Sequence, residues 1–186
     1  MTKPFLRRAF NRVLHLIARH SPGAMTLRPF LHRLRGVKIG KNVFIGDDVY
    51  LENEFPELVE ILDNTTLAIR CVIIAHTQGG GRVTIGPDVL VGTGALVVCP
   101  AGKILNIGAG AVVSTGSLVT SSVAPRTLIA APRSPAVGRI TVLWNEPGSF
   151  ERFIAGIRPL RPAKTEPDAE GPSSETPAGA SQPPDP

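Results

Sequence analysis

Aliphatic residues recur every six positions through residues 37–131, in four blocks of three. The twelve positions are Ile39, Ile45, Leu51, Ile61, Leu67, Ile73, Ile85, Val91, Val97, Ile107, Val113 and Val119. Glycine often follows the aliphatic residue, and a small or β-branched residue usually stands four positions after it. Three hexads per turn predict a parallel β-helix solenoid of triangular cross-section, in which each flat face contributes one short strand per coil.

The six-residue period breaks between the blocks, where the spacing rises to ten, twelve and ten residues. We interpret these breaks as loops extruded from the solenoid at residues 52–60, 76–82 and 100–103. Because each break follows a complete set of three hexads, all three loops should leave the same corner. Insertions in solenoids tend to build the binding site, so this corner is the candidate site.

Residues 4–35 have a helical period instead, and two short helices are predicted there. The first has an apolar stripe and carries arginines on its opposite face; the stripe is Leu6, Phe10, Val13, Leu14 and Ile17. The second begins near Thr26, and its apolar side is Leu27, Phe30, Leu31 and Leu34. Two interpretations stay open. The pair packs its stripe on the solenoid or on a neighbouring subunit, or it rests on an anionic lipid surface as a basic amphipathic segment.

After the solenoid, a short helix is expected within residues 144–160, beginning near Ser149, and it should pack over the solenoid end. Residues 161–186 are rich in Pro, Ser, Ala, Gly and acids, which predicts a disordered tail. The fold class is therefore an all-β solenoid with an N-terminal helical segment and a short C-terminal helix. Its expected divisions are 1–36, 37–140, 141–160 and 161–186.

Composition explains part of this pattern. Of 186 residues 42% are hydrophobic, yet residues 56–143 contain no Phe, Trp or Tyr, which indicates a narrow aliphatic interior. Residues 1–41 carry ten basic residues and no acid, whereas residues 42–186 are net acidic, so nucleic-acid binding by the whole chain is not expected. Cys71 and Cys99 lie in apolar runs, without metal-ligand or disulfide spacing. No membrane span or signal peptide is expected, which makes the cytoplasm the default location.

His76 is the one histidine of the repeat region, and it stands where an extruded loop begins. An alcohol is a weak nucleophile at neutral pH, and imidazole has a suitable pKa to act as its general base. The alternative is a structural histidine at a corner. Glu52, Asn53 and Glu54 lie in the first extruded loop, where they either contact acceptor hydroxyls or are solvated charges.

The repeat region resembles the hexapeptide-repeat acyltransferases, in particular the branch of maltose, galactoside and polysaccharide O-acetyltransferases. The matching stretches are VKIGKNVFIGDDVYLENEFPELVEILDNTTLAIRCVIIAHT (37–77), VTIGPDVLVGTGALVV (83–98) and IGAGAVVSTGSLVTSSVAPRTLIAAP (107–132). They cover about half of the chain. The resemblance implies a left-handed β-helix, a homotrimer with sites at the subunit interfaces, acetyl-CoA as co-substrate, no metal, and His76 as the base.

The resemblance also implies roles for other residues. Backbone amides and hydroxyls for coenzyme A would come from Thr93, Gly94, Thr115, Thr120 and Ser121. Relatives often have a phosphate-binding lysine where this chain has Ser121, so Arg126 or Arg133 is expected to supply that charge. Acceptor contacts are assigned to Glu52, Asn53 and Gln78, the last at the place where maltose-type relatives carry their base.

Together these patterns predict an acetyl-CoA-dependent O-acetyltransferase acting on a sugar, polysaccharide or lipid-linked saccharide. It would work in the cytoplasm or at the inner face of the membrane, with peripheral contact through residues 4–35. The alternative is a catalytically silent solenoid that serves as a scaffold or binding protein. A γ-type carbonic anhydrase is disfavoured, since its zinc needs three histidine ligands and the repeat region has one.

Overall fold

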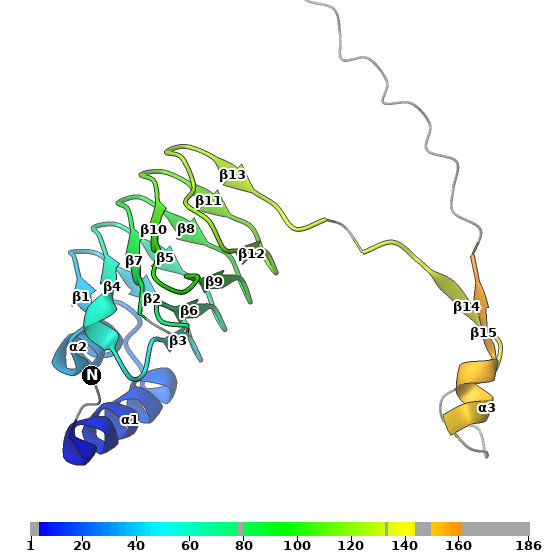
Figure 1. Ribbon diagram of the computed structural model, residues 1–186, viewed down its shortest axis with the longest axis horizontal. Coiled ribbons are helices and arrows are strands. Elements are labelled where there is room, and N and C mark those ends of the chain that lie inside the picture. Colours follow the sequence, from blue (N-terminus) through cyan, green and yellow to red (C-terminus); the bar gives the residue numbers. More distant parts are fainter. Residues whose placement is uncertain (1–3, 78–79, 133, 144–149, 161–186) are drawn as a thin grey trace, which may run out of the picture. The chain divides into compact units, whose positions relative to one another are not determined.

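The computed structural model describes residues 4–77, 80–132, 134–143 and 150–160. The chain divides into two compact units, Met1–Pro132 and Arg133–Pro186. The first unit begins with two helices, α1 (Phe5–His20) and α2 (Leu27–Arg35), and continues as a stack of short strands (Figure 1). The candidate site lies entirely in this first unit.

Three parallel sheets form the faces of the solenoid (Figure 1). The first face contains β1 (Lys38–Ile39), β4 (Val59–Ile61), β7 (Arg82–Ile85) and β10 (Ile104–Ile107). The second contains β2 (Phe44–Ile45), β5 (Thr66–Leu67), β8 (Leu90–Val91), β11 (Val112–Val113) and β13 (Leu128–Ile129). The third contains β3 (Tyr50–Leu51), β6 (Val72–Ile74), β9 (Leu96–Val98) and β12 (Leu118–Val119). Each of the first four coils thus contributes one strand to every face, as predicted, and β13 adds a fifth strand to the second face.

The strand register matches the sequence repeat residue by residue. On the first face Ile39, Ile61, Ile85 and Ile107 pair in succession. The corresponding aliphatic residues pair on the other two faces. All twelve point inward, and all except the half-buried Ile39 are at most 4% exposed. The described core holds aliphatic side chains and two buried free cysteines, Cys71 and Cys99, which explains the lack of aromatic rings.

Tight corners between the faces depend on a second position of the repeat. At eight corners, the residue three places after the inward aliphatic residue has a positive φ, between 53° and 70°. These residues are Asn42, Asp48, Asn64, Arg70, Asp88, Gly94, Gly110 and Gly116. Asn, Asp and Gly tolerate this left-handed conformation at the lowest cost. The sequence therefore sets both the inward position and the turn.

The helix α2 covers the open end of the first coil with arginines. A terminal coil lacks a neighbour on one side, so its carbonyl groups need other donors. Arg33 donates to Ile39 O at 3.1 Å, on the first face. Arg28 donates to Ile45 O at 2.9 Å, on the second face. On the third face Arg35 donates to Leu51 O at 3.2 Å. Three arginines thus satisfy one carbonyl on each side of the triangle.

Both helices turn their polar sides to the solenoid, and on α2 this side carries the arginines of the cap. The buried residues of α1 are Asn11, His15 and Ala18, and the ring of His15 lies 4.7 Å from that of Tyr50. The predicted stripe of α1 is exposed instead, except for the half-buried Leu14. On α2, only Leu31 of the predicted apolar side is buried. The expectation that the stripe packs on the chain's own solenoid is therefore wrong, whereas contact with another subunit or a lipid surface stays a prediction.

The second unit contains a small antiparallel pair, β14 (Gly138–Ile140) and β15 (Ile157–Pro159), and one short helix, α3 (Phe150–Ala155). The predicted C-terminal helix is thus confirmed, and Ser149, its expected cap, lies outside the described residues. The predicted disordered tail, residues 161–186, also lies outside them. That the helix packs over the solenoid end stays a prediction.

Candidate functional site

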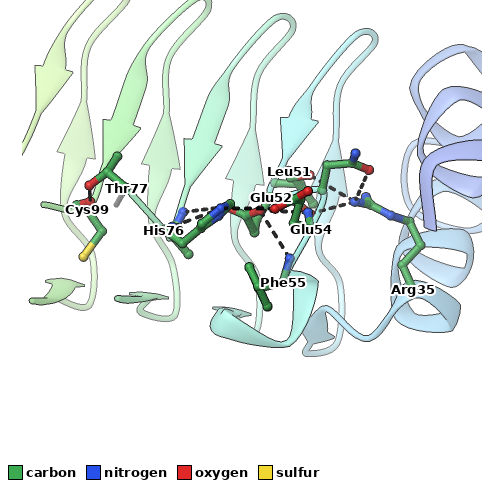
Figure 2. A network of polar contacts seen from close by, with 10 residues as sticks. Arg35, Leu51, Glu52, Glu54, Phe55, His76, Thr77 and Cys99 are labelled. Atoms are coloured by element: carbon green, nitrogen blue, oxygen red, sulfur yellow. Dashed lines mark hydrogen bonds and ion pairs between the residues drawn. The ribbon is translucent and has the colours of Figure 1, made fainter. Parts of the chain in front are cut away.

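The imidazole of His76 is held by a carboxylate from the neighbouring coil (Figure 2). His76 follows β6, at the start of the second extruded loop. Its Nδ1 lies 2.9 Å from Oε2 of Glu52, and its side chain is 27% exposed. The ring of Phe55 packs edge-on against the imidazole, with ring centroids 4.9 Å apart. His76 therefore has a carboxylate close to Nδ1 and an aromatic ring against it, while part of its side chain is open to solvent.

Glu52 is built into the fold as a buried carboxylate, 3% exposed. Its Oε1 accepts hydrogen bonds from the backbone amides of Glu54 and Phe55, and its Oε2 accepts from those of Ala75 and His76. Burial alone would raise the pKa of this carboxyl, but the contact with His76 and the amides of Phe55 and Glu54 lower it below its ordinary value. Glu52 thus stays ionised at neutral pH although it is buried.

The backbone around Glu52 is anchored to the helical cap. Arg35 donates to the carbonyl oxygen of Glu52 at 2.7 Å, and its guanidinium also reaches Oδ1 of Asn53 at 3.5 Å (Figure 2). Burial lowers the pKa of Arg35 to about 10, so it remains a cation at neutral pH. The residue that caps the third face therefore also positions the loop that holds His76.

This arrangement suits acid–base chemistry at the free ring nitrogen. A carboxylate beside Nδ1 favours the tautomer with its proton on Nδ1 and leaves the lone pair on Nε2. Oε2 of Glu54 lies 3.7 Å from Nε2, and the side chain of Glu54 is 43% exposed. Nε2 can therefore accept a proton from a hydroxyl that enters beside Glu54.

The three extruded loops leave the same corner of the solenoid, as predicted. Each follows a strand of the third face, namely β3, β6 or β9. They also contact one another in order along the stack. Glu52 meets His76, the Thr77 hydroxyl donates to Cys99 O at 2.9 Å, and Gly102 N donates to Gly80 O at 2.6 Å. The corner is thus a continuous surface built from three coils.

The predicted acceptor residues separate into three groups. Asn53 lines a pocket of about 340 Å³ between α1 and the first extruded loop. The other lining residues are Phe5, Arg8, Ala9, Arg12 and Glu54. Glu52 is buried below this surface, with its carboxylate directed to His76 and the loop amides. Gln78 lies outside the described residues.

The predicted coenzyme residues lie at three different corners. Thr93, Gly94 and Thr115 belong to the corner between the second and third faces, in adjacent coils. Thr120 and Ser121 follow β12, at the corner of the extruded loops, and line a pocket of about 280 Å³. Arg126 stands at the corner between the first and second faces. Arg133 lies outside the described residues.

Two residues of this surface have neighbours that the sequence did not lead us to expect. Lys103 lines the same pocket as Thr120 and Ser121. A lysine therefore lies close to Ser121, whereas the sequence led us to expect the phosphate-binding cation from Arg126 or Arg133. Glu52 was predicted to contact the acceptor, and in the structure its carboxylate lies against His76. The first two coils are offset by 22 residues, as Leu51 and Ile73 pair. This offset places residues 52–54 beside residues 74–76, so the contact between Glu52 and His76 could have been predicted from the repeat.

The described part of the chain lacks two further features, a metal-binding cluster and a membrane-spanning helix. No group of three or more His, Cys, Asp or Glu side chains there is placed to hold a metal ion. No helix among those residues is long and apolar enough to cross a bilayer.

No family model and no curated protein matches the chain. Several solved structures are similar to it. Soybean serine acetyltransferase is 26% identical with a TM-score of 0.44, over 69% of this chain and 55% of that one. A galactoside acetyltransferase in complex with coenzyme A is 18% identical with a TM-score of 0.46, over 66% and 75%. A maltose O-acetyltransferase from Clostridium difficile 630 is 20% identical with a TM-score of 0.43, over 66% and 80%.

This chain spans about half the length of the serine acetyltransferase that it matches. The solenoid fold is established by the strand register of the chain itself.

Proposed function

We propose that the protein is an acetyl-CoA-dependent O-acetyltransferase whose acceptor is a hydroxyl of a sugar, polysaccharide or lipid-linked saccharide. The observation that carries this proposal is the pair of His76 and Glu52, a half-exposed imidazole held at Nδ1 by a buried, ionised carboxylate. A purely structural corner histidine would not need a carboxylate that is itself held by four backbone amides. The resemblance of the repeat region to hexapeptide-repeat acyltransferases supplies the reaction class.

In the proposed reaction, Nε2 of His76 takes the proton from the acceptor hydroxyl as its oxygen attacks the thioester carbonyl. The carbon–sulfur bond then breaks, and the coenzyme A thiolate leaves with the proton returned by the imidazolium. Glu52 remains ionised throughout and stabilises the imidazolium. We therefore treat Glu52 as a positioning residue rather than an acceptor contact. A base placed in this way contributes about 10²–10⁴-fold in rate.

The coenzyme is proposed to use the pocket beside the extruded loops. Lys103, Thr120 and Ser121 line it together and offer one cation and two hydroxyls, the donors that a phosphate requires. We assign the phosphate-binding cation to Lys103 in preference to Arg126, since Lys103 shares the pocket with the hydroxyls of Thr120 and Ser121. Thr93, Gly94 and Thr115 lie at the other edge of the third face, where they would meet the coenzyme across a subunit interface.

A homotrimer is the proposed assembly. Outward-facing apolar residues on the solenoid support it: Leu96 and Leu118 project from the third face and are 39% and 63% exposed. Subunits that cover such a face would also bring the coenzyme residues of separate corners together. The proposed location is the cytoplasm or the inner face of the membrane.

The acceptor is proposed to enter through the pocket between α1 and the first extruded loop. Asn53 and Glu54 supply polar groups for acceptor hydroxyls, and Glu54 also reaches toward Nε2 of His76. Gln78 is proposed to contact the acceptor as well.

Calorimetric titration with acetyl-CoA, followed by an assay of free thiol release with a panel of nucleotide sugars and oligosaccharides, tests this function. The enzyme should bind acetyl-CoA and release thiol faster with one class of acceptor than without any. Absence of binding at millimolar acetyl-CoA would contradict the proposal and favour the silent scaffold. A variant Lys103→Met should weaken acetyl-CoA binding, while Arg126→Met, its matched control at another corner, should leave it unchanged.

A further inference from the structure

The helix α1 presents an apolar face to solvent on the side opposite the solenoid. Six large apolar side chains, between 46% and 81% exposed, make up this face: Phe5, Leu6, Phe10, Val13, Leu16 and Ile17. The polar residues Asn11 and His15 are buried against the first coil instead. A surface helix normally does the reverse and buries its apolar stripe. Within residues 4–77, 80–132, 134–143 and 150–160, this face of α1 is left uncovered.

The same inversion continues on α2, so each of the two helices exposes apolar side chains. Leu27, Phe30 and Leu34 are 40–53% exposed, while Arg28 and Arg35 are directed inward to the carbonyls of the first coil. The orientation of α2 is fixed by these hydrogen bonds, because turning α2 over would remove the donors from the cap. We name this surface, formed by the exposed apolar residues of α1 and α2, the outer apolar surface.

We propose that the outer apolar surface docks the protein on an anionic lipid bilayer. Arginines border the apolar face of α1. At 100° per residue, Arg7 projects from one side of the face and Arg12 from the other, and both are exposed. Arg8 and Arg19 lie on the same helix but pair with Glu54 and Asp48, and Arg7 also donates to the carbonyl oxygen of Arg35 at 3.2 Å. Apolar side chains between basic flanks are the pattern of a helix that lies in the plane of the interface.

Charge distinguishes the lipid from a second copy of the chain as the occupant. Residues 1–46 contain no Asp or Glu, so no acidic side chain of this segment could answer the arginines. A two-fold contact through the outer apolar surface would bring the same basic flanks together and oppose like charges. Anionic headgroups would neutralise them, at about 1 kcal/mol per basic residue near the membrane surface. α1 has 16 residues and would therefore lie along the bilayer rather than cross it.

Flotation of the full chain with lipid vesicles tests this proposal. We expect binding to vesicles of phosphatidylcholine mixed with phosphatidylglycerol, weaker binding to phosphatidylcholine alone, and a decrease as salt is raised. The variant Leu6→Gln/Val13→Gln/Ile17→Gln should bind the mixed vesicles at least about tenfold less, since three apolar side chains no longer enter the lipid. Glutamine preserves helix propensity, and none of the three residues lines a described pocket.

The matched control is Val137→Gln/Leu143→Gln/Ile154→Gln, which changes three apolar residues of the second unit that are 76%, 60% and 47% exposed. This control should bind vesicles as the unaltered chain does. Equal binding by the helix variant and the unaltered chain would overturn the proposal. A second result would also overturn it: the unaltered chain does not bind vesicles, and its mass by light scattering exceeds that of the helix variant. A second copy of the chain would then cover the outer apolar surface.

Discussion

One carboxylate decides how His76 can act. Glu52 occupies the Nδ1 side of the imidazole at 2.9 Å and is held in place by backbone amides of two coils. The remaining nitrogen, Nε2, lies 3.7 Å from the half-exposed Glu54. The two glutamates of one loop therefore differ in burial, and we expect them to differ in their effect on His76.

Glu52→Gln tests that distinction. Loss of the negative charge should lower kcat roughly 10²-fold, because the imidazolium formed during proton transfer loses its partner. KM for acetyl-CoA should stay unchanged, since Glu52 does not line the pocket of Lys103. Steady-state kinetics with the acceptor found in the panel measures both values. Glu54→Gln, the control from the same loop, should have a smaller effect on kcat; an equal loss in both variants would refute the special role of Glu52.

At the scale of elements, the arginine cap explains the orientation of α2. Arg28 is almost fully buried, and its guanidinium donates to Ser21 O at 2.6 Å and to Ile45 O at 2.9 Å and pairs with Asp47. Arg33 makes an equivalent contact to Ile39 O, but it is exposed. Water can therefore replace the hydrogen bond of the exposed Arg33, but it cannot replace those of the buried Arg28.

Arg28→Met should therefore lower the free energy of unfolding by about 1–3 kcal/mol, since two buried carbonyls would lose their donor. Arg33→Met should cost less than about 1 kcal/mol, because solvent reaches Ile39 O. Urea denaturation followed by circular dichroism gives both values. A cost for Arg33→Met as large as that for Arg28→Met would show that the cap does not work through buried carbonyls.

The inward-facing residue of each strand from β1 to β12 was predictable from sequence, whereas the orientation of the helices was not. Ile39 and Ile61 pair because one aliphatic residue per hexad fits a narrow interior, a constraint local to the repeat. The amphipathic pattern of α1 predicts which residues share a face, but not which face is buried. On α2, the unpaired carbonyls of the first coil require arginine donors, and this demand of the tertiary structure outweighs the usual burial of an apolar stripe.

At the scale of the whole molecule, acid should loosen the helices from the solenoid. His15 and His32 are buried beside Arg35 and Tyr50 at this junction. Burial first, and then the charge of Arg35, lower the pKa of each histidine to about 3, from 6.5 when exposed. Arg19 and Arg12 lower the pKa of His15 further, while Asp48 opposes them. The folded protein thus binds fewer protons than the unfolded chain between these two pH values.

Stability should consequently be full above about pH 6.5 and decline as the pH falls toward 3. Thermal unfolding by circular dichroism across this range measures the decline in Tm. The variant His15→Leu removes one of the two titrating groups and should flatten the decline, whereas a substitution of the exposed His20 should not. An equally steep decline in His15→Leu would show that other groups cause it.

The central claim concerns His76 as the base that accepts the acceptor's proton. The most direct measurement compares the rate of acetyl-CoA-dependent thiol release for the unaltered chain and for His76→Ala with the same acceptor. The account predicts a loss of about 10²–10⁴-fold in kcat, with unchanged affinity for acetyl-CoA and unchanged oligomeric state. A His76→Ala variant that retains the full rate would contradict it.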